Sequence, residues 1–145
     1  MAFRFSLATV LRFRQSVEKR EELALQALLL EMARARREIE GASAAVTAAR
    51  NARSEALQRT LPALQIQSMA FDVDSASERR ETLLKRLEAL EKQRIAQTDR
   101  YQAAHRDRQM LSDMKTRQRD AWEEERARAE QRFLDDVFGA RAQRH

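Results

Sequence analysis

Apolar residues in the first half of the chain recur at alternating intervals of three and four residues. That spacing is the period of a coiled-coil seam, in which one face of a helix packs against a second helix. We therefore predict one long helix over about residues 7–58, which includes Gly41 because the pattern continues beyond it. The positions of this seam are Leu25, Leu28, Met32, Ala35, Ile39, Ala42, Val46 and Ala49.

A second apolar pattern of the same period begins at Leu83 and runs less cleanly toward the C-terminus. Ser75 and Glu78 have the spacing of a capping box, in which two side chains satisfy free amide donors at a helix start. Gly139 is typical of the residue that follows a helix end. These signals predict a second helix over about residues 76–138. Its seam positions are Leu83, Leu87, Leu90, Tyr101, Ala104, Leu111 and Met114, with polar residues on or near it at Arg94, Gln97 and Arg108.

Pro62 is the only proline, and it lies between the two helical patterns. Proline removes a helical hydrogen bond and clashes with the preceding turn, so residues 59–74 are predicted to form a bend. The fold class is therefore all-α, with two long helices forming an antiparallel coiled-coil hairpin as a single domain over residues 1–145. A bend at this place sets Ile39 beside Ile95. An alanine-rich, charge-rich composition with few large apolar residues agrees with a two-helix seam.

The distribution of charge also favours an antiparallel hairpin. The net charge is +5, but the first 20 residues carry five basic side chains against Glu18, and residues 120–136 carry seven acidic side chains against three arginines. A hairpin is expected to lay these two segments side by side. Elsewhere the basic residues alternate with acidic ones, which is typical of a solvated helix face rather than of a specific nucleic-acid surface.

Residues with catalytic or metal-binding chemistry are scarce in this chain. It has no cysteine, its two histidines are His105 and the terminal His145, and it has two glycines, too few for a phosphate-binding loop. We therefore expect no enzyme activity, no cofactor and no metal. The N-terminus lacks the apolar core of a signal peptide, and no stretch approaches a membrane span. A soluble cytoplasmic protein is expected.

Most aromatic residues lie close to the two ends of the sequence. In a hairpin six of the eight aromatic side chains gather at the open end, where they either staple the termini together or insert into a partner. The bend is also unusually apolar, so it either covers the end of the seam or forms a second partner-binding tip. The six aromatic residues are Phe3, Phe5, Phe13, Trp122, Phe133 and Phe138.

The opening Met-Ala-Phe-Arg-Phe-Ser-Leu-Ala-Thr-Val-Leu-Arg-Phe-Arg resembles the start of the FliJ-type flagellar export proteins. The matching positions are Phe3, Arg4, Phe5, Leu7, Val10, Leu11 and Arg14. The resemblance implies a non-catalytic stalk and export chaperone at the flagellar base, peripheral to the inner membrane. Such a stalk docks in the pore of the export ATPase ring, contacts the export gate and handles empty export chaperones. Two alternatives stay open: the equivalent stalk of a virulence type III secretion system, and a self-associating coiled-coil scaffold.

This resemblance, with the aromatic ends, assigns two sets of partner-binding residues to a monomeric hairpin. The bend end is expected to contact the other partners through Leu64, Met69 and Phe71. The open end is expected to contact the ATPase through Phe3, Phe5, Leu7, Leu11, Arg14, Trp122, Phe133, Leu134 and Phe138.

Overall fold

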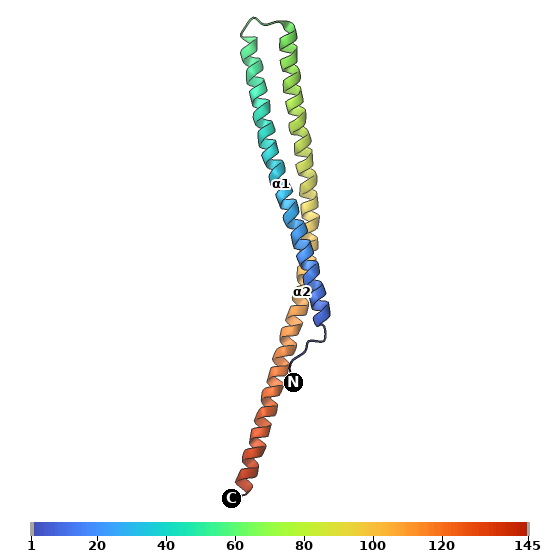
Figure 1. Cartoon of the computed structure of the whole chain (residues 1–145), viewed down its shortest axis with the longest axis vertical. Coiled ribbons are helices and arrows are strands. Elements are labelled where there is room, and N and C mark those ends of the chain that lie inside the picture. The colour runs from blue at the N-terminus through green and yellow to red at the C-terminus, as the bar shows by residue number, and fades with distance from the viewer. Residues whose placement is uncertain (1, 145) are drawn as a thin grey trace. The chain divides into compact units, whose positions relative to one another are not determined.

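The computed structural model describes residues 2–144, which form two helices and the segments around them. Helix α1 spans Ala8–Leu57 and helix α2 spans Ala63–Gln143. The two helices pack against each other as a hairpin whose connection is residues 58–62 (Figure 1). The predicted fold class, all-α with two long antiparallel helices, is confirmed.

The connection between the helices is much shorter than the bend predicted over residues 59–74. Pro62 directly precedes α2, and its carbonyl oxygen accepts hydrogen bonds from the amides of Gln65 and Ile66 at 3.1 and 3.3 Å. The predicted start of the second helix near residue 76 is therefore wrong. Ser75 and Glu78 lie inside α2. A proline at a helix start costs nothing, because the amide it lacks has no partner there.

The other end of α2 also differs from its prediction. The helix continues through Gly139 to Gln143, five residues beyond the predicted end at 138. Gly139 does not adopt a positive φ, the conformation with which glycine ends a helix. The first helix, by contrast, ends at Leu57, one residue from the prediction.

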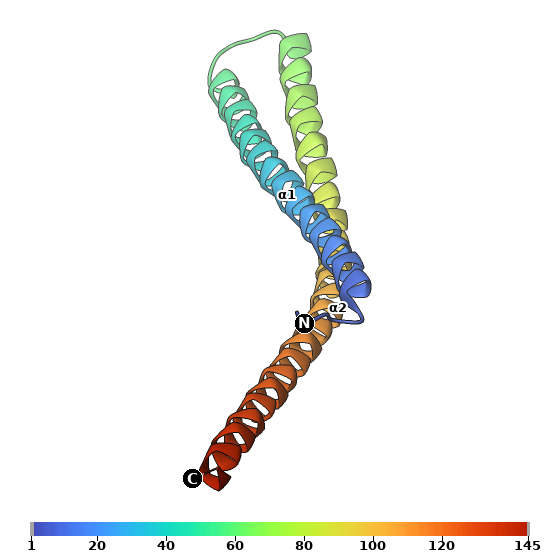
Figure 2. The same ribbon diagram turned by 60° about the horizontal axis from the view of Figure 1, so that its bottom comes forward.

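Two compact units can be distinguished in the chain, and each is described by itself. The second unit covers residues 21–100, and its two helices lie side by side in Figures 1 and 2. Met32, Ala35 and Leu90 form its core, with half-buried Leu28 and Leu87 packed around them. The predicted seam of the first helix is confirmed, because all eight of its positions are buried or half-buried.

The register of the second unit is given by polar contacts across the seam. Arg80 Nε donates to Ser43 Oγ at 2.8 Å. The predicted pairing of Ile39 with Ile95 would set Ser43 beside residue 91, eleven residues away from Arg80, so that register is wrong. The cause is the short connection between the helices. Because it is shorter than predicted, each residue of α1 faces a residue of α2 that lies closer to the start of that helix.

The first unit contains residues up to 20 and from 101 onward. Its N-terminal segment lies beside the part of α2 that ends near Trp122, as the contacts of Phe3 with Trp122 and of Arg14 with Asp107 show. The predicted pairing of residues 1–20 with the acidic residues 120–136 is therefore wrong. In Figure 1 the last part of α2, coloured orange to red, has no second helix of this unit beside it.

The single domain predicted over residues 1–145 stays a prediction, because the two units are described separately. Position 145 lies outside the described residues.

Candidate partner-binding surfaces

Five of the predicted open-end residues belong to the N-terminal segment, and the structure uses them mainly for packing. Phe5 and Leu11 are buried, with 8% and 6% of their surfaces exposed. Phe3 is half-buried and meets Trp122, with ring centroids 6.1 Å apart. Leu7 is also half-buried. These apolar side chains therefore hold the N-terminal segment against α2.

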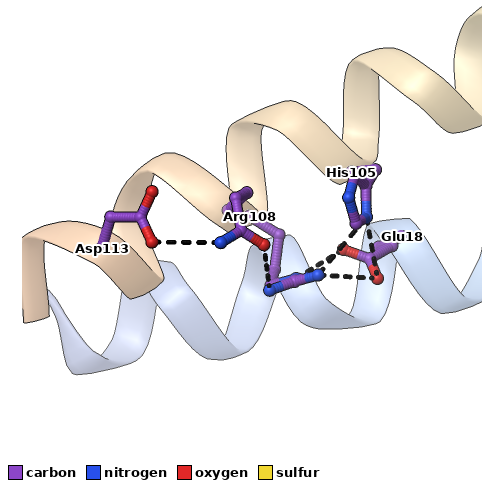
Figure 3. A network of polar contacts seen from close by, with 5 residues as sticks. Glu18, His105, Arg108 and Asp113 are labelled. Atoms are coloured by element: carbon purple, nitrogen blue, oxygen red, sulfur yellow. Dashed lines mark hydrogen bonds and ion pairs between the residues drawn. The ribbon is translucent and has the colours of Figure 1, made fainter. Parts of the chain in front are cut away.

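Arg14, the fifth of these residues, takes part in an ion pair across the two helices. Its Nη1 lies 3.4 Å from Asp107 Oδ2, and its side chain is 41% exposed. One turn further along α1, Glu18 accepts a 2.6 Å hydrogen bond from Arg108 Nε (Figure 3). His105 Nδ1 lies 3.8 Å from Glu18 Oε1. This polar layer occupies seam positions, where it favours one register of the helices over others.

The electrostatics of this layer follow from the Glu18–Arg108 pair. The hydrogen bond from Arg108 lowers the pKa of Glu18, against a smaller opposing effect of burial. The same hydrogen bond raises the pKa of Arg108. Figure 3 shows the network continuing from Arg108 to Gln109, which donates to Asp113 at 3.0 Å. The arrangement stabilises ionised side chains and therefore fits a structural role.

The C-terminal segment, which we define as residues 123–143 of α2, contains three of the other four predicted open-end residues; the fourth, Trp122, lies just before it. Phe133, Leu134 and Phe138 are 67%, 47% and 63% exposed. The structure thus places three large apolar side chains on one segment, and it does not gather Phe133 and Phe138 with Phe3 and Trp122 as predicted. An open hollow of about 490 Å³ lies beside Phe133 and Leu134 and is bounded also by Arg126, Ala129 and Glu130.

Charged side chains of the C-terminal segment pair with one another along the helix. Arg126 lies 3.5 Å from Glu130, and Arg132 lies 3.1 Å from Glu125. A pair one turn apart, such as Arg126–Glu130, stabilises an isolated helix by about 0.2–0.5 kcal/mol. The segment therefore has its own support as a single helix while its apolar side chains stay open to a partner.

The bend end presents a second exposed apolar surface, within the second unit. Leu64 and Phe71 are 81% and 70% exposed, and they lie seven residues apart on one face of α2. Leu57, at the end of α1, is 59% exposed. Met69 is half-buried. The predicted tip residues Leu64 and Phe71 are thus accessible to a partner.

Two open grooves flank the seam of the second unit where its side chains are small. One, of about 630 Å³, runs past Gly41, Ala42, Ala45 and Ala76. The other, of about 400 Å³, lies on the opposite side of the seam beside Val46 and Arg80.

Among residues 2–144 no cluster of three metal-ligating side chains occurs. Neither described helix contains an apolar stretch that could span a lipid bilayer.

Sequence reasoning missed two features of these surfaces. Glu18 was not recognised as the partner of Arg108, although each occupies a seam position of its own helix. The apolar stripe of the C-terminal segment was not recognised as a separate face either. The sequence does contain a sign of this face. Glu130, Leu134, Val137 and Arg141 recur at intervals of four, three and four residues, and they lie on a different face of the helix from the seam that contains Trp122.

These features define a helical hairpin that exposes apolar surfaces at its bend and along its C-terminal segment. The family model described as Flagellar FliJ protein matches residues 3–145, and the chain belongs to that family. No curated protein and no solved structure matches the chain. Membership in the FliJ family implies a role related to flagellar export.

Proposed function

We propose that the chain is the stalk and export chaperone of the flagellar type III export apparatus. In this role a single copy docks in the export ATPase ring and links the ring to the export gate and to empty chaperones, at the cytoplasmic face of the inner membrane. The family match over residues 3–145 supports the flagellar system rather than a virulence secretion system.

The proposed contact with the ring rests on the exposed apolar side chains of the C-terminal segment. Phe133, Leu134 and Phe138 expose apolar surface to water, which is unfavourable unless a partner covers it. Aromatic side chains dominate binding hot spots, because they bury a large area at a small cost in conformational freedom. The segment has helical support of its own from its Arg–Glu pairs. It therefore suits insertion into a ring.

The N-terminal residues contribute to this contact indirectly. Phe5 and Leu11 are buried, so they support the position of the N-terminal segment rather than meet a partner. The bend end, with Leu64 and Phe71 exposed, is the surface proposed for the export gate or a chaperone. The chain acts on the ring by binding one state of its subunits better than another, since only differential affinity shifts such an equilibrium.

Ring binding is tested by comparing matched phenylalanine substitutions at the two surfaces. Phe133→Ala and Phe138→Ala should each weaken binding to the cognate ATPase by roughly 5- to 30-fold, as hot-spot truncations do. Phe71→Ala removes an equally exposed ring from the bend end and serves as the control. The chain alone should not hydrolyse nucleotide, whereas it should raise the activity of the ring. Loss of ring binding with Phe71→Ala, while the two C-terminal variants bind normally, would reverse the proposed orientation.

A further inference from the structure

The C-terminal segment has one apolar face whose two ends carry opposite charges. At 3.6 residues per turn, Glu130, Leu134, Val137 and Arg141 fall on one line along α2, with Phe133 and Phe138 on either side of it. Glu130 lies toward the start of this stripe and Arg141 toward its end. Among residues 2–144, Arg141 forms no ion pair, and Glu130 pairs only with Arg126 of the same helix.

The opposite face of the segment is polar and is already satisfied. Arg132 pairs with Glu125 at 3.1 Å, and Asp135 accepts a hydrogen bond from Gln131 at 3.0 Å. Asp136 also lies on this side, about half a turn from the stripe. The two aspartates therefore do not obstruct a helix that approaches the apolar face.

We infer that this stripe binds the same stripe of a second copy of the chain, with the two helices antiparallel. In an antiparallel pair centred between residues 135 and 136, Leu134 opposes Val137 of the second copy, and Phe133 and Phe138 flank this contact at the same level on opposite sides. The same register sets Glu130 opposite Arg141, and twofold symmetry makes this charge pair occur twice.

Charge complementarity selects this arrangement over a parallel one. A parallel pair would place Glu130 beside Glu130 and Arg141 beside Arg141, and like charges in such positions are unfavourable.

The expected association is weak and reversible. The stripe extends over about three turns of helix, so the paired segments bury less than the roughly 1,200 Å² typical of stable complexes. The inference concerns the chain alone and does not rest on the proposed function. If that function also holds, self-association and ring binding use Phe133 and Phe138 in turn and exclude each other.

Sedimentation velocity of the full chain at increasing concentration tests the inference. The native chain should shift from monomer to dimer as its concentration rises. Phe138→Ala should raise the dissociation constant by about 30-fold, because a symmetric dimer loses each contact twice. Leu30→Ala, which changes a 65% exposed apolar side chain of the second unit, should leave the constant unchanged. A native chain that stays monomeric at every concentration would overturn the inference.

Charge reversal tests the orientation of the two helices. Glu130→Arg alone and Arg141→Glu alone should each weaken the dimer, because each places like charges opposite one another. The double variant should restore the native dissociation constant, since both pairs become complementary again. Single variants that associate normally, or a double variant as weak as the singles, would refute the antiparallel pairing. A failure here leaves ring binding by the monomer untouched, so the two proposals fail separately.

Discussion

Replacement of Met32 by alanine tests whether the hairpin depends on its narrow seam. Met32 is the most buried large side chain described, with 1% of its surface exposed, and it packs with Ala35 and Leu90. The substitution removes three heavy atoms, and their transfer to water costs about 0.8 kcal/mol per methylene-sized group, or roughly 2.4 kcal/mol. A cavity adds to this cost where the surroundings do not relax.

Relaxation limits the cavity contribution at this site. Leu28 and Leu87, which pack against the core, are only half-buried, so they are free to shift toward the vacated space. We expect Met32→Ala to lower the free energy of unfolding by about 2–3 kcal/mol, near the lower end of the range for buried methionine. This is a large fraction of the roughly 5–15 kcal/mol that stabilises most proteins.

Urea denaturation followed by far-ultraviolet circular dichroism measures this loss. Leu30→Ala is the matched control, because Leu30 is on the same helix and 65% exposed, and its substitution should change the stability by less than about 0.5 kcal/mol. A double-mutant cycle with Leu90→Ala should show a coupling energy of at least about 0.5 kcal/mol, since the two side chains are in contact. Equal losses for Met32→Ala and Leu30→Ala would refute the account of the core.

The remaining predictions concern a glycine and a carboxylate. Gly41→Ala should raise the stability by about 1 kcal/mol, because an added Cβ meets no atom within 4 Å and alanine favours the helix; destabilisation in urea would contradict this. Arg108 lowers the pKa of Glu18. The contribution of ionised Glu18 to the free energy of unfolding is therefore complete above the ordinary carboxyl pKa of 4.5, and it is lost as the pH falls through the lowered pKa. Thermal unfolding from neutral to acidic pH should therefore show a smaller decrease for Glu18→Gln than for the native chain.

Local features of the chain were predictable from sequence to different degrees. The seam of α1 follows from its three-four spacing, because apolar side chains at that period share one face of any helix. The polar seam positions Gln97 and Arg108 were identified in the same way, and Gln97 is indeed buried, with a 3.1 Å hydrogen bond to the backbone carbonyl of Glu21. The capping signal at Ser75 failed because the residues before it also favour helix and Val73 extends the seam.

Register and the composition of the surfaces were decided only by tertiary structure. The length of the connection fixes which residues of α2 meet α1 in the second unit, eleven residues from the predicted register. In the first unit Phe3 meets Trp122 and Arg14 meets Asp107, so most of the acidic C-terminal segment lies beyond the basic N-terminal one. Phe133 and Phe138 accordingly lie beyond the residue of α2 that Phe3 contacts, and they stay exposed. The sequence alone thus determined that two long helices form and which face of α1 is buried, because both depend on local periodicity. The tertiary structure decided which apolar side chains stay exposed, because that depends on where the partner helix ends.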